Sequence, residues 1–142
     1  MKTFRIRTLV AAAAIAVSLH GAAFAQGLPA EMPVSKADLM VRKAGGILID
    51  VRTPEEWAQT GVPATAHTVS NDDPDFVSRI SYIAGGDTTA RIALICRTGH
   101  RSAEARDKLL AAGFTNVTSI EGGISGPNGW VDADLPLRPY SQ

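Results

Sequence analysis

Four short apolar runs recur along the chain, separated by polar segments that carry helix or turn signals. The runs are four to six residues long and rich in β-branched residues, which is typical of buried strands. The clearest of them is "RIALIC" at 91–96. We expect strands at residues 46–51, 67–70, 91–96 and 116–120.

The segments between these runs predict helices. Thr53 stands at an N-cap position, followed by Pro54 in the first helical position and by Glu55 and Glu56 in the first turn. Further along, "SAEARDKLLAA" has apolar residues at helical spacing and ends at Gly113. We expect helices at 35–43 with Ser35 as the cap, from 54 until residues 60–63 break the helix, from about 74 to 83, and at 102–112.

Strands that alternate with helices predict a parallel sheet covered on both faces and joined by right-handed crossovers. The sequence contains no internal repeat and no sign of a second domain. Residues 27–33 have the composition of a flexible lead-in. We therefore expect a lead-in over 26–34 and one α/β domain over 35–142.

Composition places the chain among ordinary soluble domains. It has 142 residues, of which 45% are hydrophobic and 20% charged, and its formal net charge is zero. Nothing in that charge balance points to nucleic acid as a partner.

The first 25 residues have the layout of a secretory signal. The cations Lys2, Arg5 and Arg7 precede an apolar stretch at 9–19, and the small-x-small site "AFA" follows at 23–25. We expect cleavage after residue 25, a periplasmic location and no membrane attachment afterwards. An uncleaved N-terminal anchor is the alternative.

Cys96 is the only cysteine in the sequence. A lone cysteine in an exported protein is buried and inert, paired between chains, or reactive. Cys96 ends the clearest strand, and ligands of open α/β sheets bind outside the carboxyl ends of the strands. The loop from Cys96 to Arg101, with Gly99 in the middle, can turn several backbone N–H groups toward one spot. A helix that begins near Ser102 would add the positive end of its dipole.

This loop predicts an anion site around a reactive thiol. Arg97 and Arg101 bring two positive charges, and such surroundings lower the pKa of a cysteine. From spacing alone, a buried and inert Cys96 is an equal alternative. Besides the expected signal, the sequence has two histidines, His67 and His100, so we expect neither a metal nor an organic cofactor.

Three motifs resemble those of the single-domain rhodaneses, a family of thiosulfate and related sulfurtransferases: "LIDVRTPEEW" at 48–57, "CRTGHRS" at 96–102 and "EGGISGPNGW" at 121–130. The resemblance, to an exported bacterial member, implies a rhodanese-like α/β fold with about five parallel strands and helices on both faces. It places the persulfide-carrying nucleophile on Cys96. The substrate-binding positions that it implies are Arg97, Thr98, Gly99, His100, Arg101 and Ser102.

The length of the loop favours sulfur chemistry. Four residues separate Cys96 from Arg101, as in the sulfurtransferases that this chain resembles, whereas phosphatases on the same scaffold have five. The resemblance therefore implies transfer of sulfane sulfur from thiosulfate or a similar anion to a thiophilic acceptor, which includes a protein acceptor. A non-catalytic sulfur carrier and a phosphatase or arsenate reductase-like enzyme are the alternatives. We expect a monomer.

Two segments depart from the family pattern. Residues 61–66, "GVPATA", lack the histidine and the second glycine of the family's "GHIPGA", and "ISGPNG" separates Gly123 from Trp130. We interpret 121–130 as a glycine-rich surface segment that reshapes one edge of the pocket. Structural roles are expected for Asp50, Arg52, Trp57 and Trp130.

Overall fold

The computed structural model describes residues 27–141, and a parallel β-sheet runs through its middle. The five strands lie in the order β1-β6-β5-β2-β4, and every neighbouring pair is parallel. The bounds are β1 (Glu31–Met32), β2 (Ile47–Asp50), β4 (His67–Thr68), β5 (Ile92–Ile95) and β6 (Val117–Ile120). The predicted parallel sheet is confirmed, and β5 is its central strand.

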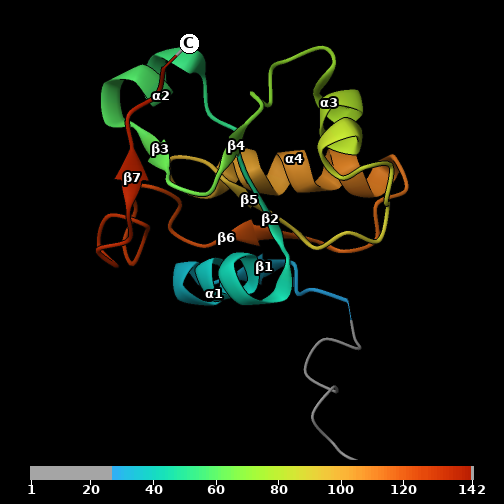
Figure 1. The fold of residues 1–142 in the computed structure, drawn as a ribbon, viewed down its shortest axis with the longest axis horizontal. Helices are drawn as coiled ribbons and strands as arrows, with labels where there is room; N and C mark the ends of the chain where they lie inside the picture. The colour runs from blue at the N-terminus through green and yellow to red at the C-terminus, as the bar shows by residue number, and fades with distance from the viewer. Residues whose placement is uncertain (1–26, 142) are drawn as a thin grey trace, which may run out of the picture.

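Four helices of the described chain surround the sheet: α1 (Val34–Ala44), α2 (Pro54–Thr60), α3 (Phe76–Ile83) and α4 (His100–Ala111). Helix α1 lies on one side of the sheet, and α3 and α4 lie on the other (Figure 1). The predicted coverage of both faces is therefore confirmed.

The side chains of β5 alternate between the two faces, as a strand requires. Ile92 and Leu94 pack in the cluster that includes α3 and α4, while Ala93 and Ile95 pack in the cluster with α1. Cys96 continues the first set and belongs to the α3 and α4 cluster. The alternation alone thus directs the thiol toward the face on which α4 begins.

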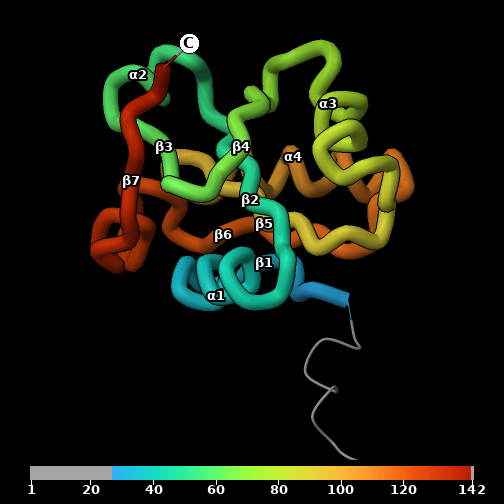
Figure 2. Tube along the Cα trace, viewed as in Figure 1, coloured from blue at the N-terminus to red at the C-terminus, as the bar shows by residue number. Residues whose placement is uncertain are grey.

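A second, two-stranded sheet was not predicted. It pairs β3 (Val62–Pro63) with β7 (Leu137–Arg138) in antiparallel register. The C-terminal segment runs beside β3 and ends next to α2 (Figure 2). Two-residue strands are too short to leave a periodic pattern in a sequence, so only the tertiary pairing reveals them.

The start of the domain differs from the prediction. Residues 31–32 of the expected flexible lead-in form the edge strand β1, paired with β6. Helix α1 then begins at Val34 with Pro33 at the N-cap, and no side chain caps it. Ser35 lies inside the helix, so its predicted capping role is wrong, because the pairing of β1 decides where the chain turns.

Other boundaries moved by a few residues. Helix α4 begins at His100, two residues before the predicted start at Ser102, and α3 begins at Phe76. The strand predicted at 67–70 is reduced to β4. Within residues 27–141, no helix is both long and apolar enough to cross a membrane. The predicted signal at 1–25 lies outside the described residues.

Candidate active site

The thiol of Cys96 lies immediately after the central strand and is buried, with 1% of the residue exposed. Its Sγ accepts a hydrogen bond from the backbone N–H of Gly99 at 3.0 Å. The Oγ of Ser102 lies 3.4 Å from the same sulfur. The sulfur is therefore enclosed by its own loop and by the first turn of α4.

The turn of the loop depends on Gly99. This residue is the N-cap of α4 and has a φ of 111°, a backbone conformation that residues other than glycine rarely adopt. The turn aims the N–H of Gly99 back at Sγ, as the predicted nest of backbone donors requires. The prediction that backbone N–H groups converge on the Cys96 side chain is confirmed.

A buried hydroxyl pair lies behind the sulfur. Ser102 is fully buried, donates a hydrogen bond to the carbonyl of Gly99 at 3.0 Å, and lies 2.8 Å from the Oγ of Ser119 on β6. Ser102 was predicted at the helix start, whereas Ser119 was not predicted at all. The available signal was a serine at the centre of a buried strand, where an unpartnered hydroxyl is costly.

These contacts decide the protonation of Cys96. Burial is the largest single influence and raises the pKa of the thiol. The hydroxyl of Ser102 and the backbone N–H groups of Ser102, Gly99 and Thr98 together outweigh burial, so the net pKa is lowered. A larger fraction of Cys96 is consequently thiolate, the nucleophilic form. The predicted direction is confirmed, and hydrogen bonds are its cause.

Arg101 brings the predicted positive charge, and the structure pairs it with a carboxylate that the sequence did not indicate. Its two terminal nitrogens donate to the two carboxylate oxygens of Glu56 on α2, both at 2.7 Å. The hydrogen bond with Arg101 is the main reason that the pKa of Glu56 is lowered to about 2. The pKa of Arg101 is raised, chiefly by Glu56 and to a smaller extent by the negative charge of Cys96. The guanidinium thus faces a carboxylate, close to the sulfur.

The other loop side chains point outward. Arg97, Thr98 and His100 are all exposed. Beside them is a cavity of about 270 Å³ lined by Glu31, Thr98, Gly99, His100, Ala103, Glu121 and Gly122. The loop therefore presents one face to the buried sulfur and the other to solvent.

The glycine-rich segment at 121–130 is a surface segment only in part: Glu121, Ser125, Pro127 and Asn128 are exposed, whereas half of its residues are buried. Ile124 donates its backbone N–H to the carbonyl of Cys96 at 2.8 Å, and Ser125 donates to that of Arg97 at 3.1 Å. Gly123 is buried with a φ of 57°, and a Cβ there would collide with the carbonyl of Cys96. Small residues allow this segment to pack directly against the loop that follows Cys96.

Trp57 and Trp130 are both buried, as expected for packing residues. The ring of Trp57 contacts that of Tyr140, with centroids 5.1 Å apart. Trp130 donates its indole N–H to the carbonyl of Pro136 at 3.1 Å. Neither side chain lines the cavity beside the loop.

Asp50 and Arg52 form a buried ion pair, in agreement with the structural role expected for them. Their charged atoms lie 2.7 Å apart, and Arg52 also donates to the carbonyl of Gly61 and to Oγ1 of Thr60, each at 2.7 Å. The pair therefore fixes the turn that follows α2. This is the segment in which "GVPATA" departs from the family pattern.

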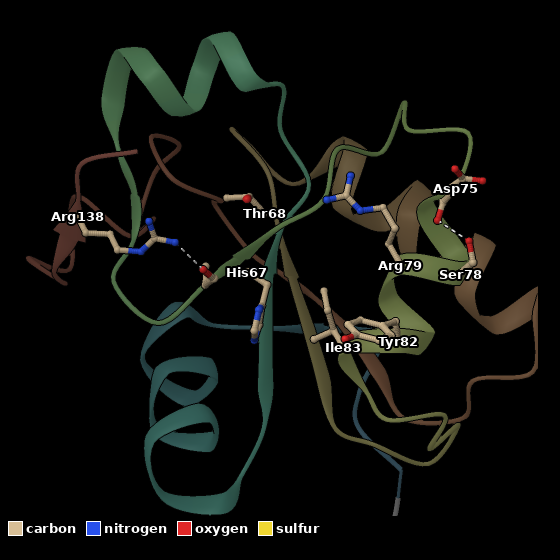
Figure 3. A pocket seen from close by; sticks show the side chains of 9 residues that line it. His67, Thr68, Asp75, Ser78, Arg79, Tyr82, Ile83 and Arg138 are labelled. Carbon is tan, nitrogen blue, oxygen red and sulfur yellow. Dashed lines mark hydrogen bonds between the residues drawn. The ribbon is translucent and has the colours of Figure 1, made fainter. Parts of the chain in front are cut away.

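A wider groove of about 810 Å³ lies between β4, α3 and β7 (Figure 3). His67, Arg79, Tyr82 and Arg138 line it, and Arg138 donates to the carbonyl of Ala66 at 3.0 Å. None of the residues at 96–102 borders this groove, so size alone does not locate the chemistry. Among residues 27–141, no cluster of three or more histidine, cysteine or acidic side chains could hold a metal ion.

The geometry is that of a buried cysteine with a lowered pKa between a strand and the helix that follows it, and the comparisons identify the family. A family model described as a rhodanese-like domain matches residues 34–129. The chain belongs to this family. The chain is 36% identical over 120 residues to thiosulfate sulfurtransferase 16, chloroplastic, of Arabidopsis thaliana, covering 78% of this chain and 94% of that protein.

Two further relatives extend the comparison. Thiosulfate sulfurtransferase GlpE of Stutzerimonas stutzeri is 32% identical over 93 residues, covering 66% of this chain and 79% of that protein. The solution structure of the rhodanese-like domain of an Anabaena protein superposes with a TM-score of 0.66 at 16% identity, covering 80% and 81% of the two chains. That likeness shows the rhodanese fold.

Proposed function

We propose that the protein is a sulfurtransferase that moves sulfane sulfur from thiosulfate, or a similar donor, to a thiophilic acceptor through a persulfide on Cys96. The observation that carries the proposal is the buried Sγ of Cys96, which accepts a hydrogen bond from the loop at 3.0 Å and has a lowered pKa. Relatives named thiosulfate sulfurtransferases support the choice of donor.

The reaction is a double displacement. The Cys96 thiolate attacks the outer sulfur of thiosulfate, an S–S bond forms to Cys96, and the bond to the inner sulfur breaks as sulfite leaves with the electron pair. An acceptor nucleophile, such as cyanide or a thiolate, then attacks the outer sulfur of the persulfide. The S–S bond breaks, its electron pair returns to Cys96, and the thiolate is regenerated.

The loop stabilises charge in both states. Backbone donors that face the Cys96 thiolate can also face the anionic outer sulfur of a persulfide, since both lie at the positive end of α4. Because these donors are fixed before the reaction, no reorganisation is needed as charge moves along the S–S bond.

The test is an intact-mass measurement after incubation with thiosulfate, with Cys96→Ser as the control. The expected result is a gain of one sulfur atom that cyanide removes, and no gain in the variant. Folded wild-type protein that acquires no sulfur from thiosulfate or a polysulfide would overturn the proposal. Release of phosphate from an aryl phosphate, without sulfur uptake, would establish the phosphatase alternative.

A persulfide that forms but does not turn over with small acceptors would establish the carrier alternative.

We also propose that the protein is exported, on the basis of the signal-like pattern at 1–25. Cell fractionation and N-terminal sequencing test this proposal, because periplasmic protein beginning at Gln26 is expected. Full-length protein retained in the cytoplasm would overturn it.

A further inference from the structure

Two crossover helices begin side by side at the carboxyl edge of the sheet. Strands β2 and β5 are adjacent, with Asp50 paired to Ile95, so the segments that follow them emerge next to each other. Glu56 lies in the first turn of α2 and Arg101 in the first turn of α4. Their double hydrogen bond joins the two helices across 45 residues of sequence.

Glu56 is itself held in place. Its carboxylate accepts the backbone N–H of Thr53 at 3.1 Å, and its own N–H donates to Oγ1 of Thr53 at 3.4 Å, which completes a capping box. The next residue, Trp57, is buried against Tyr140. The carboxylate is therefore a fixed point rather than a loose surface group.

The ion pair with Glu56 gives Arg101 a structural role. Both of its terminal nitrogens face Glu56, so an incoming anion does not meet an uncompensated guanidinium. Arg101 directly precedes Ser102, whose hydroxyl lies 3.4 Å from Sγ, and follows Gly99 by two residues. Holding the end of Arg101 consequently holds the first turn of α4 against the sulfur.

We propose that Glu56 is a positioning residue of the sulfur site: through Arg101 it keeps the Ser102 hydroxyl and the Gly99 N–H directed at Cys96. The expected effect of Glu56 on turnover rests on the proposed function. Its effect on the free thiol is independent of any substrate. Arg101 then acts as part of the scaffold, and the backbone donors act on the reacting sulfur.

The test is a double-mutant cycle of Glu56→Gln, Arg101→Gln and the double variant. Glutamine at position 56 can still cap α2, because a capping box accepts glutamine as well as glutamate, but it removes the charge from the pair. Glu55→Gln is the matched control, since Glu55 is exposed in the same helical turn. Two quantities are measured: the pH dependence of Cys96 alkylation by iodoacetamide, and kcat and KM with thiosulfate.

Each single variant should move the alkylation midpoint upward, because the donors that stabilise the thiolate lose their alignment. Each should lower kcat roughly ten- to a hundredfold, the range that a small misplacement of a reacting group costs, with little change in KM. The double variant should be no worse than the more impaired single variant, and Glu55→Gln should match wild type.

Three results would overturn the proposal. The first is Glu56→Gln behaving like Glu55→Gln, and the second is an alkylation midpoint of Glu56→Gln below that of wild type. The third is a raised KM in Arg101→Gln, with the effects of Glu56→Gln and Arg101→Gln multiplying in the double variant. The last would mean that Arg101 binds the donor directly. Arg101→Lys covers a folding failure of Arg101→Gln, because lysine keeps the charge but not the double contact and should show the same upward midpoint. An upward midpoint in Glu56→Gln, together with wild-type protein that takes up no sulfur, would refute the proposed function and leave the positioning role standing.

Discussion

Replacing Ser102 with alanine should make the Cys96 thiolate harder to form. The hydroxyl of Ser102 has one proton, and in the thiol state it donates to the carbonyl of Gly99 at 3.0 Å. When Cys96 ionises, that proton can turn toward Sγ, 3.4 Å away, while Ser119 donates to Ser102 from 2.8 Å. Alanine removes the hydroxyl that responds to the charge on the sulfur.

The size of the effect follows from the geometry. A hydrogen bond to a charged group contributes about 1.5–3 kcal/mol, and about 1.4 kcal/mol corresponds to one pH unit. The Ser102 contact is long, and the N–H of Gly99 remains 3.0 Å from the sulfur, so the lower end of the range applies. We expect the midpoint of Cys96 ionisation to rise by about one pH unit.

The assay is the rate of alkylation by iodoacetamide between pH 5 and 10, roughly the range that brackets thiol ionisation in proteins. Ser119→Ala is the control, because it removes a buried hydroxyl from the same pair but not the contact with Sγ. The control should lose stability with a smaller change in midpoint. An unchanged midpoint in folded Ser102→Ala would refute the reasoning and reduce Ser102 to a packing residue.

Three further predictions concern stability. Gly123→Ala should cost about 1–3 kcal/mol of unfolding free energy and slow Cys96 alkylation, because the new Cβ forces the loop carbonyl to move; urea denaturation measures the cost. Asp50→Asn should cost about 3–5 kcal/mol, since it leaves Arg52 charged and buried without its partner, and should lower the melting temperature. Glu56→Gln should lose stability most above pH 4.5, where the unfolded carboxyl is ionised, and approach wild type as the pH falls toward 2, because the folded pKa is depressed from 4.5 to about 2.

Controls for these predictions lie on the surface. Gly86 has a φ of 77°, and a Cβ at that position would have no neighbour within 4 Å, so Gly86→Ala reports backbone strain without a collision. Arg79 forms an exposed ion pair with Asp73, and Arg79→Gln should cost less than about 1 kcal/mol. Equal losses in a buried variant and its surface control would contradict the reasoning, as would a stability difference for Glu56→Gln that does not shrink in acid.

Much of the site was predictable because it is local in sequence. Cys96, Gly99 and Ser102 lie within seven consecutive residues, and the end of a buried strand followed by a glycine turn specifies where backbone donors point. The cap of α2 at Thr53 was predictable for the same reason, since a capping box spans four residues. Such features depend on the spacing of residues along the chain, which can be read directly from the sequence.

Contacts between distant segments were not predictable in this way. Glu56 carries the signals of an ordinary helix start, and nothing in its neighbours indicates a partner 45 residues away. Ser119 and the glycine-rich segment at 121–130 meet the loop only because β6 pairs with β5 and returns the chain to the same edge of the sheet. Arg101 keeps the positive charge that the sequence predicts, but the sequence did not reveal that this charge is paired with Glu56.

The sequence by itself determined the α/β class, the candidate nucleophile and the turn that surrounds it, because hydrophobic period, capping and glycine conformation act over a few residues. The tertiary structure decided which groups stabilise the thiolate and which carboxylate pairs with Arg101. Hydrogen bonds and ion pairs act over about 3 Å, so their partners are known only when the folded chain brings distant residues that close together.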